Sequence, residues 1–169
     1  MISEKLLKEL NDQTKYEFAS ANYYLAMAAY CLDQDLDGFA NFFKVQADEE
    51  TFHAMKFFNF INDSGSRIVI QGFENPKNDF KSLEEVFSDA LTHEKFVTQR
   101  INDMMEIAIQ EKNFACVSFL NWFIDEQVEE ESMFSTLLNK VRRIGNSDAG
   151  LFLLDAELAK RTFTPPAAE

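Results

Sequence analysis

A stretch of seventeen residues, SRIVIQGFENPKNDFKS at 66–82, separates two long helix-forming segments and constrains the fold more than any other feature of this sequence. Two neighbouring antiparallel helices need a connection of only about 2 to 8 residues. Seventeen residues can span up to about 56 Å when extended, whereas a helix of about 27 residues is only about 40 Å long. The stretch is therefore expected to cross the whole length of a helical bundle, so that the helices before and after it run parallel.

Apolar residues recur with a helical period in four long segments and one short one. Ser3 is a suitable N-cap, Gly65 a suitable C-cap, and SLEE at 82–85 a capping box. The expected helices span 4–33, 38–63, 83–111, 114–143 and 148–160, and a loose tail follows at 162–169. The sequence predicts one all-α domain over 1–169. Its form is a four-helix bundle with one long crossover, from the second helix to the third, and a short fifth C-terminal helix.

Charge and composition disfavour several classes of partner. A formal net charge of −13 disfavours nucleic-acid and anionic-membrane binding, which need clustered Lys and Arg, and makes metal cations better partners. The longest apolar run, YYLAMAAYCL at 23–32, is far shorter than the roughly 20 residues of a membrane span, and no signal-peptide pattern is seen. Cys31 and Cys116 are isolated, which predicts buried free thiols. We expect a cytoplasmic protein without nucleic-acid or membrane partners.

A glutamate interrupts the apolar stripe of each long helix near its middle. Projection at about 100° per residue places Glu17, Glu94 and Glu130 on rows that are otherwise mostly apolar. In the second helix, Glu50 shares such a row with His53. All four long helices therefore carry an acid at a similar depth, on the face that should be buried.

Any one of these glutamates is more simply explained as a residue at the edge of the apolar stripe, which extends its carboxylate to water or pairs it with a lysine. Four together, with no Lys or Arg to pair them, would repel one another and take up protons unless cations held them. Oxygen-rich ligands with one imidazole suit iron or manganese better than zinc. The pattern favours two ions, with Glu17, Glu50 and His53 at the first, Glu50 able to bridge, and Glu94 with Glu130 at the second.

These residues make the sequence resemble the bacterial non-haem ferritins over essentially its whole length, from Glu17 through EETFH at 49–53 and Glu94 to NWFIDEQVEEE at 121–131. The resemblance implies the ferritin-like form of the bundle and a two-iron ferroxidase centre with the same five ligands. It also implies a third iron site beside the centre, a nearby glutamine, and a tyrosine that is a candidate electron donor. These residues are Glu49, Glu126, Glu129 and Glu130 for the third site, Gln127 for the glutamine, and Tyr24 for the tyrosine. For Tyr24, a hydrogen-bonded core tyrosine is the alternative.

Differences between this sequence and related di-iron families favour a non-haem ferritin over a bacterioferritin or a rubrerythrin. A bacterioferritin or rubrerythrin would carry a second E-x-x-H on the fourth helix, where this chain has Gln127 and Glu130. Phe52 stands where the haem-binding methionine of a bacterioferritin is expected, so no haem is predicted. Trp122 matches a tryptophan near the centre, for which packing is the simpler role, and His93 is expected on the surface.

The resemblance implies iron storage and detoxification. The ferroxidase centre would oxidise Fe(II) to Fe(III) with O2 or peroxide, and ferric mineral would be deposited inside a hollow homo-oligomeric shell. The family implies twenty-four subunits, a number that no feature of composition or spacing gives. The apolar segment LFLL at 151–154 is the expected symmetry contact. Two alternatives stay open: a di-iron carboxylate oxidase or oxygenase of another class, or a structural helical bundle.

Overall fold

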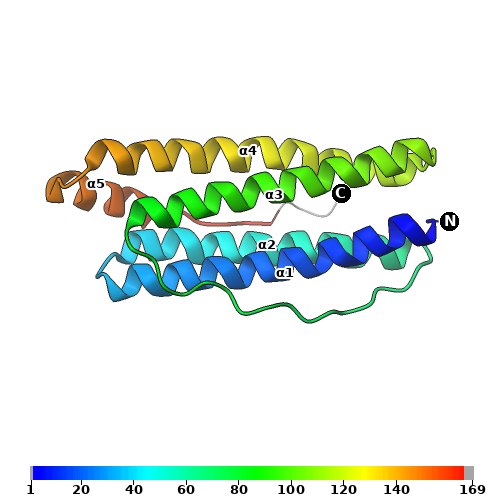
Figure 1. Cartoon of the computed structure of the whole chain (residues 1–169), viewed down its shortest axis with the longest axis horizontal. Coiled ribbons are helices and arrows are strands. Elements are labelled where there is room, and N and C mark those ends of the chain that lie inside the picture. The colour runs from blue at the N-terminus through cyan, green and yellow to red at the C-terminus, as the bar shows by residue number, and fades with distance from the viewer. Residues whose placement is uncertain (1, 166–169) are drawn as a thin grey trace.

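The computed structural model describes residues 2–165, and over that range the chain forms five α-helices joined by loops. The helices are α1 (Glu4–Asp33), α2 (Asp37–Asp63), α3 (Leu83–Gln110), α4 (Phe114–Ile144) and α5 (Asp148–Leu158). The four long helices lie side by side, and α5 lies at one end of the bundle (Figure 1). Residue 1, and residues 166–169 of the expected tail 162–169, lie outside the described range. Among the described helices, none combines the length and apolar character of a membrane span.

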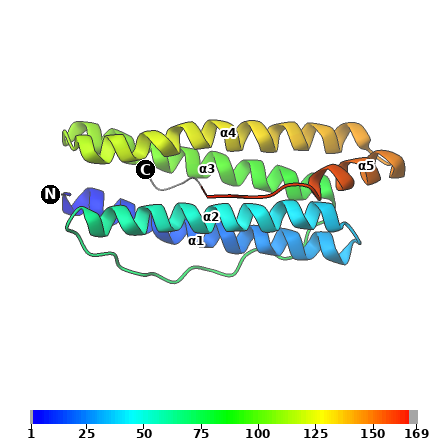
Figure 2. The same cartoon turned by 180° about the vertical axis from the view of Figure 1, so that it is seen from behind.

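The chain between α2 and α3 runs along the outside of the bundle from one end to the other (Figures 1 and 2). Helices α1 and α2 form one antiparallel pair and α3 and α4 another, so α2 and α3 are parallel (Figure 1). The predicted bundle with one long crossover is confirmed. Hydrogen bonds from the Val69 backbone N–H to Asn11 (2.6 Å) and from Gln71 to Asp12 (3.0 Å) hold the crossover against α1.

The observed helix ends differ from the expected ones by at most two residues. Helix α2 begins one residue earlier than 38, at Asp37, and α5 ends at Leu158 rather than at 160. Helix α3 ends one residue before the expected 111, and α4 one residue after the expected 143. Lys112 and Gly145 follow these two helices with positive φ, a backbone conformation that cannot continue a right-handed helix.

Side-chain caps explain where most of the helices begin. Ser3, Ser82, Asn113 and Ser147 each accept a hydrogen bond from a backbone N–H in the first turn of the following helix. Helix α2 differs, because its N-cap residue is Leu36, which makes no side-chain cap. Asp155 of α5 supplies the missing acceptor and receives the backbone N–H groups of Gly38 (2.8 Å) and Phe39 (3.0 Å). The start of α2 and the docking of α5 therefore depend on each other.

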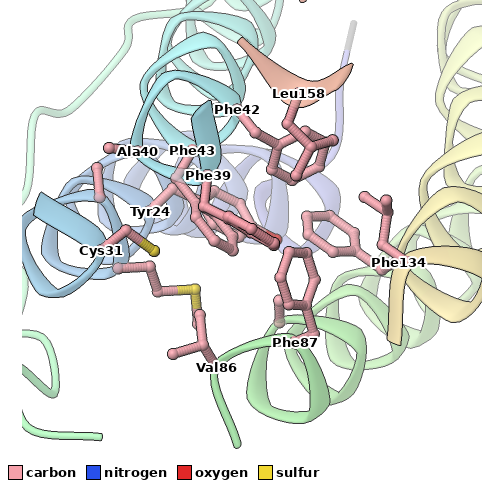
Figure 3. Packing of buried hydrophobic residues seen from close by; sticks show 14 of the residues in the cluster. Tyr24, Cys31, Phe39, Ala40, Phe42, Phe43, Val86, Phe87, Phe134 and Leu158 are labelled. Atoms are coloured by element: carbon pink, nitrogen blue, oxygen red, sulfur yellow. The ribbon is translucent and has the colours of Figure 1, made fainter. Parts of the chain in front are cut away.

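The hydrophobic core consists of two clusters, one in each half of the bundle. One cluster is rich in aromatic rings and lies toward α5 (Figure 3); its members include Tyr24, Phe39, Phe43, Phe87 and Phe134. The other lies toward the N-terminus of α1; its members include Leu6, Leu10, Phe57, Ile101 and Phe123. Buried polar residues of all four long helices occupy the layer between them.

Candidate metal centre

The polar layer gathers every acid that the sequence placed on an apolar stripe. Each long helix contributes at least one side chain with no more than 4% of its surface exposed. Helix α1 contributes Gln13 and Glu17, α2 contributes Gln46, Glu50 and His53, α3 contributes Glu94, and α4 contributes Gln127 and Glu130. Such a concentration of buried carboxylates is unfavourable unless charge or protons are supplied to it.

Three of these side chains converge on a single point. Glu17, Glu50 and His53 each offer a ligand atom, and these atoms all lie within 4.8 Å of one another. The Nδ1 atom of His53 is 3.6 Å from Oε2 of Glu50. One carboxylate oxygen of Glu17, Oε2, is buried and has no hydrogen-bond partner within residues 2–165. Because buried oxygens are nearly always hydrogen-bonded, an unsatisfied carboxylate oxygen on a member of this three-residue cluster fits a cation site.

Glu94 and Glu130 are the two remaining buried acids of the layer. The hydroxyl of Tyr24 donates a hydrogen bond to Glu94, and the amide of Gln127 donates another at 3.1 Å. Both oxygens of Glu130 accept hydrogen bonds from Nε2 of Gln46, each at 2.9 Å. The same amide contacts Glu50 at 3.3 Å. Gln46 therefore joins the cluster around His53 to the second pair of acids.

Electrostatics within the layer are dominated by burial. Burial raises the pKa of Glu17, Glu50 and Glu130 well above the usual range of a glutamate, and repulsion from neighbouring acids of the layer raises it further. Burial alone would lower the pKa of His53, but the carboxylates around it, Glu126 first among them, raise it overall. The layer thus holds protons that a divalent cation would replace.

The acids expected at a third site lie beside this centre, on the α2 and α4 side. Oε1 of Glu126 is 3.8 Å from Nε2 of His53, on the opposite edge of the ring from Glu50. Glu49 precedes His53 by one helical turn and forms a close ion pair with Arg161, which follows α5. Glu129 is exposed and lines a groove of about 730 Å³ that Arg161 also lines. The structure therefore brings Glu49 and Glu126 toward His53, while Glu129 stays at the surface.

The prediction of a surface position for His93 was wrong. Its ring is half-buried between α1 and α3, with Nε2 2.7 Å from the hydroxyl oxygen of Ser20 and the ring centroid 4.9 Å from that of Tyr23. Burial lowers the pKa of His93, so the neutral imidazole is favoured. Glu131 is also half-buried and accepts a hydrogen bond from Thr98 at 2.6 Å.

Trp122 lies against the centre. Its ring centroid is 5.4 Å from that of His53 and 4.8 Å from that of Phe123, both in edge-on contacts. The ammonium group of Lys56 lies 4.2 Å above the indole ring, a cation–π contact. These contacts pack the imidazole and restrict its orientation.

Sequence reasoning missed two glutamines of the layer. Gln13 donates to Glu17 at 2.8 Å and in turn accepts from Arg100 at 2.8 Å, so a cation is linked to the layer through one amide. Gln46 connects Glu50 with Glu130, as described above. Each glutamine precedes a buried glutamate by four residues, in QTKYE at 13–17 and QADEE at 46–50. This shared spacing places amide and acid on one helix face and could have revealed both.

Comparisons with known proteins agree with this geometry. The family model of the ferritin-like domain matches residues 7–144. A bacterial non-heme ferritin of Staphylococcus aureus (strain USA300) is 50% identical over 163 residues, which are 96% of this chain and 98% of the relative. The corresponding protein of Staphylococcus haemolyticus is 48% identical with the same coverage.

Solved structures give the same result. An engineered closed form of the Archaeoglobus fulgidus ferritin superposes with a TM-score of 0.95 at 43% identity, covering 97% of this chain and all of the other. The open-pore ferritin of the same archaeon superposes with a TM-score of 0.94 at 41% identity, covering 96% of this chain and all of the other. With the family model, the relatives and the buried Glu–Glu–His cluster in agreement, this chain belongs to the ferritin family, as a member of the bacterial non-haem ferritins.

Proposed function

We propose that this protein is a ferroxidase that stores and detoxifies iron, with the buried polar layer as its catalytic centre. The observation that carries the proposal is the convergence of Glu17, Glu50 and His53, with an unsatisfied carboxylate oxygen, at the middle of a ferritin bundle. Iron is the substrate here. Two Fe(II) ions each give one electron to O2 or peroxide, and the Fe(III) product moves on to a mineral core.

We assign the first iron to Glu17, Glu50 and His53, and the second to Glu94 and Glu130. Glu50 is the residue that both ions share, since it lies 3.6 Å from His53 and, through Gln46, is linked to Glu130. The second ion has no imidazole ligand in this assignment. Hard anionic oxygens favour Fe(III) over Fe(II), so the ligand set promotes oxidation of the bound iron.

The surrounding residues position the acids and take part in proton movement. Gln127 and the Tyr24 hydroxyl hold the Glu94 carboxylate by hydrogen bonds, and Gln46 holds Glu130. The acids with raised pKa values release protons as the iron ions enter. Tyr24 is the residue best placed to supply a further electron, because its hydroxyl touches a ligand of the second iron.

We further propose a third iron site formed by Glu49, Glu126, Glu129 and Glu130. The third site is supported by the positions of Glu49 and Glu126 beside His53. Glu49 lies on α2, as His53 does, and Glu126 lies on α4. An ion there would lie between the ferroxidase centre and the surface groove that Glu129 lines. Glu129 would have to turn inward to reach it.

The working assembly in this proposal is a hollow shell of twenty-four identical chains in the cytoplasm. Each chain is a single domain over 1–169 and binds no haem. Its support is the set of ferritin relatives, whose names include the term non-heme, and two unpaired cysteines, Cys31 and Cys116, of the kind that reducing compartments preserve. On α5, Phe152 and Leu153 are 75% and 71% exposed, a surface suited to contact between copies.

Gel filtration combined with iron loading tests the function. Twenty-four chains of 19.5 kDa give an assembly near 470 kDa, which should take up far more than two irons per chain. A monomer or dimer that stops at two irons would instead indicate a di-iron oxidase of another class. The double variant Glu50→Ala, His53→Ala should lose the fast phase of Fe(II) oxidation and keep its helicity. Glu106→Ala on the exposed face of α3 is the matched control, and unchanged oxidation in the double variant would reject the assignment.

A further inference from the structure

The segment that follows α5 turns back along α2 instead of leaving the bundle (Figure 2). The side-chain amide of Asn41 donates to the backbone carbonyls of Leu158 (3.1 Å) and Arg161 (3.0 Å). Farther along, the ring of Phe163 lies 5.7 Å from that of Phe52. The segment is therefore fixed at several points along the α2 face that carries Glu49.

Arg161 is the charged residue that this arrangement delivers to the metal centre. Its guanidinium donates to the Phe42 carbonyl at 3.3 Å, lies 4.4 Å from the centroid of the Phe42 ring, and pairs with the Glu49 carboxylate. Only 19% of the Arg161 side chain and 16% of the Glu49 side chain are exposed, so the pair is largely shielded from solvent. A shielded pair is worth more than an exposed one, because water and salt screen it less.

Glu49 belongs to the third iron site assigned above, so the guanidinium holds a carboxylate that an iron ion would need. We propose that Arg161 is a built-in counter-ion of the third site. It neutralises Glu49 while no metal is bound there, and it must give up that carboxylate, wholly or in part, when an ion enters. The groove of about 730 Å³ that Arg161 lines offers the displaced guanidinium space to move away from Glu49.

The consequence is that the segment after α5 sets the affinity of the third site without providing a ligand to it. The competition weakens binding of an ion by the free energy needed to break the Arg161–Glu49 pair. The ferroxidase pair of irons does not use Glu49, so its affinity should be independent of Arg161. This inference rests on the proposed function for the existence of the third site, and it adds the residue that regulates that site.

Calorimetric titration of the assembled protein with Zn(II), a redox-inert probe, separates the sites. The variant Arg161→Gln should bind the third ion about 5- to 150-fold more tightly than the wild type, the range of typical couplings between linked sites. Arg161→Lys keeps the charge and should stay close to the wild type. Lys160→Gln makes the same charge change at the neighbouring exposed residue and should leave all affinities unchanged. Gel filtration and circular dichroism verify that each variant is folded and assembled.

A double-mutant cycle gives the decisive comparison. In a Glu49→Gln background, where the partner carboxylate has no charge, adding Arg161→Gln should produce no further gain in affinity. Equal binding of the third ion by the wild type and Arg161→Gln, or no third ion in either, would overturn the inference. Loss of the first two binding events in Glu50→Ala, His53→Ala tests the proposed function separately. Persistence of those events would reject the ferroxidase assignment, whatever the behaviour of Arg161.

Discussion

The carboxylate of Asp155 accepts a hydrogen bond from the backbone N–H of Gly38 at 2.8 Å, across 117 residues of sequence. The contact is so close that a Cβ atom on Gly38 would lie 1.8 Å from the backbone oxygen of Asp155. One interaction thus caps α2, docks α5 and requires a glycine.

Gly38→Ala should therefore displace α5 and lower the free energy of unfolding by about 1–3 kcal/mol, the usual range for overpacking a tight contact. Denaturant unfolding measures the loss, and hydrogen exchange should show reduced protection across α5. Gly72→Ala, whose added Cβ would meet no atom within 4 Å, is the control and should change little. Equal stability of the two variants would contradict this account of α5 docking.

Gln46→Ala should slow Fe(II) oxidation by about 10- to 100-fold, the effect usual for residues that orient metal ligands through hydrogen bonds. The amide of Gln46 holds Glu130 and contacts Glu50, so its removal frees one proposed ligand of each iron. Stopped-flow absorbance measures the rate. Gln99→Ala removes an exposed glutamine of α3 that donates a hydrogen bond to Asp103, and this variant should oxidise iron at the wild-type rate. A wild-type rate in Gln46→Ala would show that the acids need no such support.

Tyr24→Phe should separate the contribution of the Tyr24 hydroxyl to catalysis from the contribution of its ring to packing. The tyrosine ring stacks on Phe134 with centroids 5.6 Å apart, and this contact survives the substitution, so the melting temperature should change little. The hydroxyl that bonds Glu94 is lost, and multi-turnover Fe(II) oxidation should slow. Tyr30→Phe, half-buried near the end of α1, is the control. Unchanged oxidation would make Tyr24 a packing residue only.

The stability of the metal-free protein should fall as pH rises, through Glu50. Its folded-state pKa is raised by burial and by repulsion from Glu94, so its contribution to stability is fully present below the unfolded pKa of about 4.3. That contribution is lost as pH rises toward the folded pKa. Glu50→Gln mimics the protonated acid, so the variant should gain stability over the wild type with increasing pH. Denaturant unfolding of both proteins at a series of pH values measures the difference, and a difference independent of pH would refute the argument.

Sequence patterns predicted the bundle because the features that determine it are either local in sequence or depend only on the length of a segment. The period of the apolar residues, the capping box at Ser82 and the length of the 66–82 connection each have one simple structural outcome. The four mid-helix acids were found for the same reason, because the helical period alone shows that each lies on an apolar stripe.

Contacts between distant segments could not be predicted in this way. The pairing of Asp155 with Gly38 and of Arg161 with Glu49 joins residues more than a hundred positions apart. Neither pairing follows from a helical period, because the first depends on where α5 docks and the second on the path of the chain after α5. His93 was misplaced for a related reason: its position on α3 is near the stripe edge, and its burial comes from Ser20 and Tyr23 of α1.

The core is divided into two apolar clusters, so the residues that pack the bundle lie toward its two ends and the polar residues of the candidate metal centre lie between them. Phe87 and Phe134 belong to one cluster and Phe57 and Phe123 to the other, and the buried acids lie in the layer between them. In the proposed ferroxidase centre, iron ions would enter and leave this middle layer while the apolar cluster at each end keeps the helices packed. The two apolar clusters would hold the four long helices in place while the contents of the polar layer between them change.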